Sequence, residues 1–181
     1  MSNSLYLFPA QPHAAPPPRR AVREVLGELG CIAGPLTGGG FAVGQAFLQL
    51  VTFAGCSPHL VFTPPAPGSR DFCHLELLGP YRAARMYTGP HTAGPRCPHC
   101  NARLRAWQAM QEAWQAGSAW PCPACGQAAT VERWRWRRQA AFGRLLIVVR
   151  QVFPSEGVPS DRLLTALAEA TGTTWDYAWA A

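Results

Sequence analysis

The sequence predicts an α+β protein with a small mixed sheet, covering helices and an inserted four-cysteine module. Three observations predict this fold class. The chain has 181 residues, 48% of them hydrophobic and 14% charged, which is enough apolar material for one packed core. Strand-like and helix-like segments both occur, without an internal repeat. Two Cys-x-x-Cys pairs lie close together in the second half of the chain.

The first twenty residues predict a flexible arm, because five of them are prolines, which do not fit a helix interior or a central strand. The apolar run 5–8 is too short for the core of a signal peptide. An odd number of cysteines also argues against a fully disulfide-paired secreted protein. We therefore expect a cytoplasmic protein. The alternative for 5–8 is that Tyr6 and Phe8 dock onto the body as an added strand.

Two covering helices are predicted with marked ends. Over 21–29, apolar residues recur at helical spacing, and Gly30 follows as a terminator. Over 161–171, the same spacing lies between Ser160, a suitable N-cap, and Gly172, which closes the helix.

A third helix is predicted over 42–54, in the most apolar part of the chain. No charged residue lies between Glu28 and Arg70. A membrane span would need about 20 predominantly apolar residues, and glycines at 38–40 and two glutamines interrupt this run. We expect a buried helix and no membrane insertion.

The sheet is predicted from segments 59–88 and 145–179. Runs bounded by proline and glycine predict strands over 59–63, 72–78, 84–87, 145–153 and 175–179. These assignments divide the chain into a flexible arm (1–20), an N-terminal α+β part (21–95), a zinc-binding module (96–138) and a strand-helix-strand segment that completes the body (139–181).

Two Cys-x-x-Cys pairs predict a metal site formed by Cys97, Cys100, Cys122 and Cys125. Two thiolates separated by two residues can bind one ion, because the tight turn between them points both sulfurs the same way. Asn101 and Gly126, which tolerate a positive φ, follow the two pairs. Four thiolates in tetrahedral geometry form the structural zinc arrangement, with no open position for water. We expect one structural Zn²⁺.

Residues 97–126 resemble a zinc ribbon, particularly in the Cys-Pro-x-Cys-Gly sequence at 122–126. Zinc ribbons occur in transcription, translation and replication proteins, in enzymes and in interaction modules, so the resemblance implies a metal and not one function. One departure is the segment 102–116, whose apolar spacing predicts a helix where ribbons usually carry a β-hairpin.

Two other chemistries use related cysteine patterns. Disulfide exchange needs a Cys-x-x-Cys at a helix N-terminus in a thioredoxin-like fold. An iron–sulfur cluster also uses four cysteines. The proline and turn residue of both pairs favour zinc over either.

Positive charge is concentrated around the cysteines. The formal net charge is +6, and all 16 basic residues are arginine, which we attribute to a GC-rich bacterial genome. Between Arg96 and Arg150, nine arginines are accompanied only by Glu112 and Glu132, a net charge of +7.

The segment 133–138, Arg-Trp-Arg-Trp-Arg-Arg, is predicted as a strand with Trp134 and Trp136 on one face. Aromatic and basic side chains together bind single-stranded nucleic acid. The alternative is that both tryptophans pack against the helix stripe that contains Trp107 and Trp114. The expected partner is a nucleic acid or an acidic protein, and the expected partner-binding residues are Arg133, Arg135, Arg137 and Arg138.

Together these features predict a zinc-stabilised binding or adaptor protein, without catalysis. The alternative is an enzyme in which zinc is purely structural and a thiol and an imidazole carry the chemistry. Its groove would contain Cys56, Ser57, His59 and His74, with Cys56 and His59 as the catalytic candidates.

Overall fold

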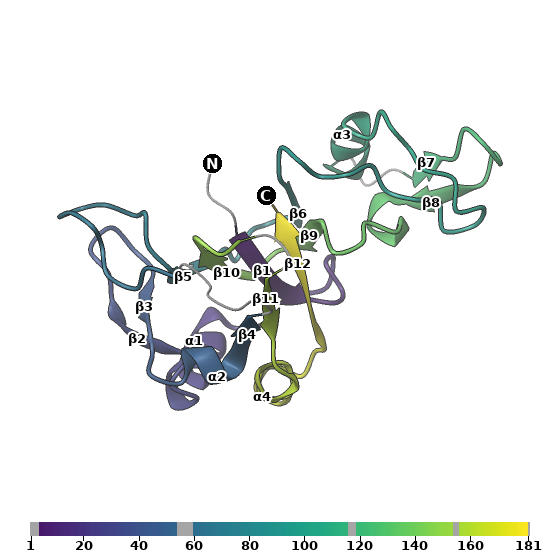
Figure 1. Cartoon of the computed structure of the whole chain (residues 1–181). Coiled ribbons are helices and arrows are strands. Elements are labelled where there is room, and N and C mark those ends of the chain that lie inside the picture. Colours follow the sequence, from purple (N-terminus) through teal and green to yellow (C-terminus); the bar gives the residue numbers. More distant parts are fainter. Residues whose placement is uncertain (1–3, 54–59, 116–118, 154–155, 181) are drawn as a thin grey trace.

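The computed structural model describes residues 4–53, 60–115, 119–153 and 156–180, and six strands form its central sheet (Figure 1). In sheet order these are β12 (Trp175–Ala180), β1 (Ser4–Pro9), β10 (Leu146–Arg150), β5 (His74–Leu78), β3 (Phe41–Val43) and β2 (Ile32–Pro35). Every neighbouring pair is antiparallel. The predicted α+β class is confirmed, but the strands of this sheet alternate in direction where a mixed sheet is predicted.

Strand β1 lies inside the sheet, between β12 and β10. Its residue Leu5 is paired with Trp179 on one side and Val149 on the other, and it is fully buried. The prediction of a flexible arm is therefore wrong for β1, and the alternative of a docked strand is right. Proline does not prevent the pairing, because Pro9 is the last residue of the strand and the other prolines follow it.

Helices α1 (Arg19–Glu28) and α4 (Asp161–Thr171) cover one face of the sheet (Figure 1). Their apolar sides join side chains of β1, β5 and β10 in the main core. The Ser160 hydroxyl accepts a hydrogen bond from the N–H of Leu163, and Gly172 has a φ of 68°. Both predicted ends of α4 are therefore confirmed.

The predicted helix over 42–54 is wrong. After β3, this segment forms only the short helix α2 (Phe47–Leu50) and then strand β4 (Val51–Phe53), which pairs with β11 (Gly157–Pro159). Among the described helices, none has the length and apolar character that a membrane span requires.

A close backbone approach explains why no long helix forms here. The N–H of Gly44 donates to the carbonyl of Cys31 at 2.9 Å. A Cβ atom at Gly44 would overlap the carbonyl oxygen of Gly30. The chain at Gly44 is therefore held against the preceding segment, and a continuous helix would break this contact.

The predicted strand over 59–63 is also absent where it is described. His59 lies outside the described residues, and 60–63 form no strand. The carbonyl of Val61 nevertheless accepts a hydrogen bond from the N–H of Cys73, next to β5. This single hydrogen bond places the segment 60–63 next to the residues that lead into β5, but the two segments do not pair as strands.

The other face of the sheet is covered by β6 (Arg85–Thr88) and β9 (Ala140–Gly143), which pair with each other. A second apolar cluster joins β9 to β1, β10 and β12. The strands predicted over 72–78, 84–87, 145–153 and 175–179 correspond to β5, β6, β10 and β12.

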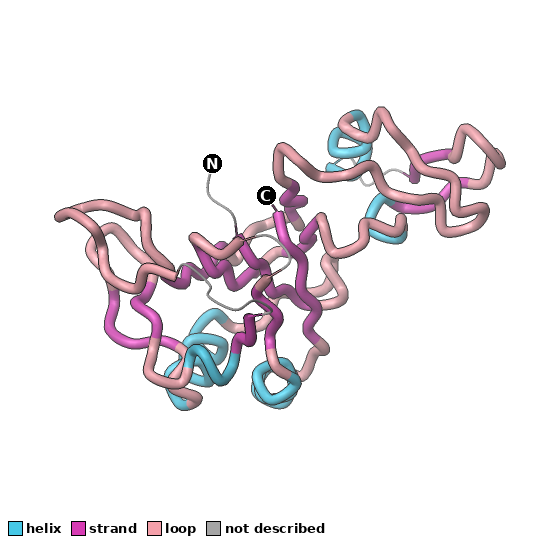
Figure 2. The backbone as a smooth tube through the Cα atoms, in the orientation of Figure 1, coloured by secondary structure: helices cyan, strands magenta, loops and turns pink. Residues whose placement is uncertain are grey.

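The chain leaves the body through β6 and returns through β9, and the residues between them extend to one side (Figure 1). We name residues 96–138 the cysteine module. Its regular elements are α3 (Ala109–Gln115), β7 (Ala119–Pro121), β8 (Ala128–Thr130) and the 3₁₀ turn Val131–Arg133. Most of the remainder is loop (Figure 2). The helix predicted over 102–116 is present only in its second half.

A third apolar cluster, rich in tryptophan, joins the cysteine module to β6 and β9. The predicted helix stripe is buried there together with the tryptophans of the later segment: Leu104, Trp107, Met110, Trp114, Trp134 and Trp136. Trp107 and Trp136 meet edge to face, with their ring centroids 5.5 Å apart. The packing alternative for the two later tryptophans is therefore confirmed.

Candidate metal centre

Each Cys-x-x-Cys pair lies in the same kind of turn. In the first, the Cys97 N–H donates to the Ala102 carbonyl at 2.9 Å, and the Asn101 N–H donates to the Cys97 carbonyl at 3.0 Å. The equivalent residues of Cys122–Gln127 make the same two bonds, at 2.9 and 2.8 Å. Asn101 and Gly126 have φ values of 63° and 74°, the left-handed conformation for which their residue types suit them.

Short β-structure holds both turns in place. The second turn connects β7 to β8, which pair antiparallel. The first turn is closed by a bridge between Arg96 and Arg103 and by a hydrogen bond from the Leu104 N–H to the Pro95 carbonyl at 2.9 Å. Two hairpin ends with matching geometry therefore face each other.

The two turns bring four sulfur atoms together. All four Sγ atoms lie within 4.8 Å of one another. The Sγ atoms of Cys97 and Cys125 are 3.8 Å apart, and those of Cys100 and Cys122 are 3.7 Å apart. A disulfide would require about 2.05 Å. A tetrahedron of thiolates with metal–sulfur bonds of about 2.3 Å has edges of about 3.8 Å. The four cysteines are thus positioned to hold one metal ion.

The pKa values of two thiols in the cluster, Cys97 and Cys125, are shifted in opposite directions. Desolvation raises the pKa of Cys97, but the backbone N–H groups of Cys100 and His99 outweigh it and lower the pKa to about 6. The N–H of Gln127 favours the Cys125 thiolate, but desolvation and the neighbouring sulfurs raise its pKa to about 12. Four thiolates at this spacing repel one another, so a bound cation is needed to ionise them all.

The ligand set is closed. Cys97 and Cys122 are buried, while Cys100 and Cys125 face solvent. Among the described residues, no histidine or carboxylate joins the four sulfurs. Such a set has no free coordination position for a water or a substrate, which is typical of a metal that stabilises structure.

Three arginines lie side by side next to the first turn. Arg96 is bridged to Arg103 on one side and to Arg135 on the other, and both bridges are antiparallel. Directly opposed residues of antiparallel strands point to the same face, so the three side chains share one face. Arg96 and Arg103 flank the first cysteine pair in the sequence, but only the fold brings Arg135 next to them. We name Arg96, Arg103 and Arg135 the arginine row.

The row is stabilised by carbonyl groups and by no carboxylate of the described chain. Arg96 Nη1 donates to the Asn101 carbonyl at 3.0 Å, and Arg135 Nη2 donates to the Pro98 carbonyl at 3.3 Å. No described Asp or Glu lies within ion-pair distance of the row. Like charges directly opposed on neighbouring strands destabilise a fold, so stability alone does not explain the row.

The predicted Arg-Trp strand over 133–138 is not formed. The segment 133–138 begins in the 3₁₀ turn, makes a single bridge at Arg135 and ends in a tight turn. Trp134 and Trp136 are only 3% and 5% exposed, so they are not available to stack on bases. Arg133, Arg135 and Arg137 are exposed, as the alternation predicts, and Arg138 is exposed as well.

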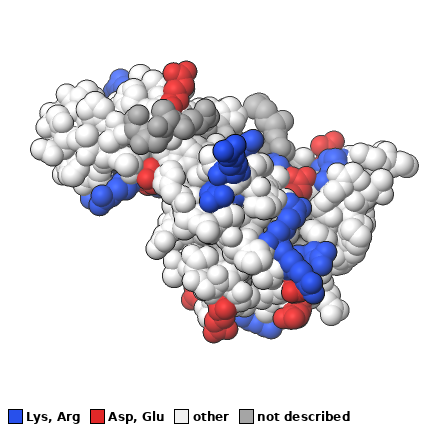
Figure 3. Space-filling model, turned by 180° about the vertical axis from the view of Figure 1, so that it is seen from behind, with Lys and Arg blue, Asp and Glu red and all other residues white. Residues whose placement is uncertain are grey.

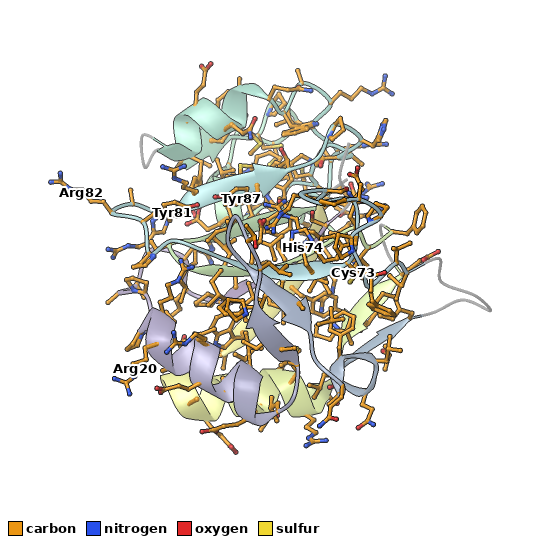
Figure 4. The ribbon with its side chains drawn as sticks, turned by 90° about the vertical axis from the view of Figure 1, so that its left-hand side faces the viewer. Arg20, Cys73, His74, Tyr81, Arg82 and Tyr87 are labelled. Carbon is orange, nitrogen blue, oxygen red and sulfur yellow. The ribbon has the colours of Figure 1, made fainter. Side chains whose placement is uncertain are left out.

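The predicted thiol–imidazole groove is described only at His74. Cys56, Ser57 and His59 lie outside the described residues. His74 is buried, and Figure 4 shows it next to Cys73. Its Nδ1 lies 2.7 Å from the Phe72 carbonyl, and its Nε2 lies 3.4 Å from Glu76 Oε1. These contacts give both ring nitrogens of His74 a partner in or next to β5. The enzyme alternative therefore stays a prediction.

The two described cysteines of the body are poor nucleophiles. Burial raises the pKa of Cys31 to about 12, and burial followed by the proximity of Cys31 does the same for Cys73. Only the thiolate is a nucleophile or a metal ligand. Both therefore pack as small apolar side chains in the core.

The fold and the site together define a class: an α+β protein with an inserted four-cysteine cluster that is positioned to hold a metal ion. No protein-family model matches the chain, and neither does any curated protein or solved structure.

Proposed function

We propose that this protein is a zinc-stabilised nucleic-acid-binding protein whose cysteine module contacts the phosphate backbone. The observation that carries the proposal is the arginine row, in which three guanidinium groups share one face without a described carboxylate partner. Arginine presents paired N–H donors that match phosphate geometry.

A nucleic acid fits this module better than an acidic protein does. Protein interfaces depend on aromatic or other apolar anchors that enter pockets of the partner. Here the large, highly exposed apolar residues of the described chain are Leu48, Val61 and Phe153, and none lies in the cysteine module. Nucleic-acid interfaces are more polar and much more positively charged. Because the tryptophans are buried and cannot stack on bases, contacts between arginines and the phosphate backbone of the nucleic acid supply the affinity.

The charge is also unevenly distributed over the module. On the side of the molecule shown in Figure 3, the end that carries the cysteine module is mostly uncharged, with a few blue and red side chains towards its edges. This side therefore offers few arginines to a polyanion.

Zinc is the metal that the ligands favour. Thiolates are soft ligands, and a tetrahedral set of four selects zinc or iron. The paired turns hold four separate sulfurs around one point, with edges near those of a single-ion tetrahedron. The ion would join two hairpin ends and fix the two bridged segments that carry Arg96 and Arg135, so its contribution to binding is structural.

Fluorescence anisotropy with short labelled duplex and single-stranded nucleic acids tests the proposal. The variant combining Arg103→Gln and Arg135→Gln should weaken binding about tenfold or more and reduce the salt slope by about two phosphate contacts. Its bound metal should be measured alongside, because Arg135 also donates to the first cysteine turn.

The matched control combines Arg23→Gln and Arg162→Gln, which removes the same charge from exposed positions on α1 and α4. It should bind as the wild type does. Equal weakening in both variants would show that only net charge matters and would overturn the arginine row as the binding surface. Capture of an acidic protein with no measurable nucleic-acid affinity would reject the partner class.

A further inference from the structure

A cavity of about 330 Å³ lies where the cysteine module meets the body. Its walls come from three separate parts of the chain: the end of β1 and the residues after it, the segment 132–142, and the first residues of β12. Its volume falls in the range of about 300–1,000 Å³ for small-ligand sites. Arginine and aromatic side chains line it together, including Arg133, Arg137 and Tyr177.

A strained turn forms the rim of this cavity. Arg137 and Arg138 have φ values of 53° and 59°, and the Gln139 N–H donates to the Trp136 carbonyl at 3.0 Å. This is a two-residue turn with both central residues in the left-handed conformation, where Asn-Gly is strongly preferred. Two arginines in these positions are unfavourable, so their side chains must have a use that offsets the backbone conformation.

The contacts of Arg138 show its structural role. Its Nη1 lies 2.7 Å from Asp176 Oδ1 and 3.2 Å from the Tyr177 carbonyl, and its guanidinium lies 3.8 Å from the centroid of the Tyr177 ring. The Arg138 carbonyl also accepts a hydrogen bond from the Trp179 N–H. Arg138 therefore fixes the turn to β12.

Arg137 and Arg133 have no such role. Neither side chain makes a hydrogen bond or ion pair with any residue in the described part of the chain, and both are exposed at the cavity. The nearby carboxylates are already in use, since Asp176 is paired with Arg138 and Glu132 accepts the Trp114 indole N–H at 2.7 Å. Glu132 and Asp176 also line the cavity, so its three arginines leave one positive charge in excess, and the side chains of Arg133 and Arg137 have no described partner.

We infer that this cavity binds one nucleotide unit, with its phosphate on Arg133 and Arg137 and its base and sugar against Tyr177. The inference rests on the proposed function for its ligand class. Two guanidinium groups at the rim suit a phosphate. Tyr177 is the half-buried aromatic side chain of the lining and supplies the contact surface, whereas Phe8 and Phe142 are buried. A base within a duplex cannot enter a cavity of this kind, so the unit is a free nucleotide or a nucleotide of a single strand.

The key variant is Arg137→Asn, because asparagine tolerates the left-handed conformation and preserves the turn while it removes the guanidinium. Arg105→Asn is the control, since Arg105 is exposed in the same module and does not line the cavity. The probes are the four ribonucleoside 5′-monophosphates, inorganic phosphate and a short single strand. Titrations follow tryptophan fluorescence, because Trp134 and Trp136 line the cavity.

Arg137→Asn should weaken binding of a mononucleotide about tenfold or more. If only the single strand binds, the variant should weaken binding of that strand by the same factor. Arg105→Asn should leave that binding unchanged. Inorganic phosphate should bind more weakly than the nucleotide. Equal affinity of wild type and Arg137→Asn for every probe, or no binding of any probe at millimolar concentration, would overturn the inference.

The outcome is distinguishable from failure of the proposed function. Arg137→Asn should leave duplex binding by the arginine row intact, whereas the combined Arg103→Gln and Arg135→Gln variant should lose duplex binding and keep mononucleotide binding.

Discussion

Trp136 closes the core of the cysteine module against Trp107, edge to face, with the ring centroids 5.5 Å apart. The Trp136 indole N–H also donates to the Val131 carbonyl at 2.8 Å. Trp107 follows the first cysteine pair and Trp136 follows the second, so the pair joins the two halves of the module independently of the metal.

Replacement of Trp136 should therefore destabilise the module. Trp136→Ala removes a buried ring and its hydrogen bond, and we expect a loss of about 3–5 kcal/mol in the free energy of unfolding. Trp136→Phe keeps much of the ring contact and should lose less. Chemical denaturation measures both. The assignment would be contradicted by an alanine variant as stable as the wild type.

Removal of one sulfur ligand should abolish metal binding. Purified wild-type protein is expected to contain one zinc ion per chain, and Cys122→Ser should contain little or none, because three thiolates bind far more weakly than a closed set of four. Cys73→Ser is the matched control, since Cys73 is equally buried but lies in the body. Elemental analysis of both variants decides the point, and metal retained by Cys122→Ser would argue against the proposed site.

Gly94 should not tolerate a side chain. A Cβ atom there would overlap the Leu104 carbonyl oxygen and press on the Trp107 ring. We expect Gly94→Ala to lower the thermal unfolding midpoint and speed loss of metal to a chelator, with a cost of about 1–3 kcal/mol. Gly27→Ala is the control, because nothing lies within 4 Å of its Cβ position in α1. That change should be neutral or stabilising by about 0.5–1 kcal/mol.

Glu76 should make the stability of the body sensitive to acid. Burial raises its pKa, but Arg150 at 2.8 Å and Arg70 at 2.9 Å outweigh burial and lower it below 4.5. A carboxyl with a depressed pKa in the folded state stabilises the fold above its unfolded pKa, and this contribution is lost as the pH falls through the folded value. Glu76→Gln should be less stable at neutral pH, and its unfolding free energy should fall less between neutral and acidic pH. Parallel pH curves for the two proteins would contradict this.

The cysteine turns and α4 are predictable from sequence because their causes are local. A Cys-x-x-Cys turn, its left-handed residue and the caps at Ser160 and Gly172 each depend on a few neighbouring residues. The buried tryptophans follow the same logic, since a regular apolar spacing marks the buried side even where Leu104 and Trp107 lie outside the helix.

The features that sequence patterns miss depend on distant partners. The apolar run of β1 is short and followed by prolines, and only its pairing with β10 and β12 makes it a strand. The apolar segment after Gly40 satisfies helical spacing, but the contact of Gly44 with the backbone before it decides its path. The arginine row arises from bridges that no local pattern contains, because Arg96 and Arg135 lie far apart in the sequence.

The position of β1 has a consequence for how the protein is made. This strand leaves the ribosome before the rest of the sheet, yet it sits between β10 and β12, which are synthesised last. The body therefore cannot reach its final hydrogen-bonded arrangement during translation until β12 has emerged.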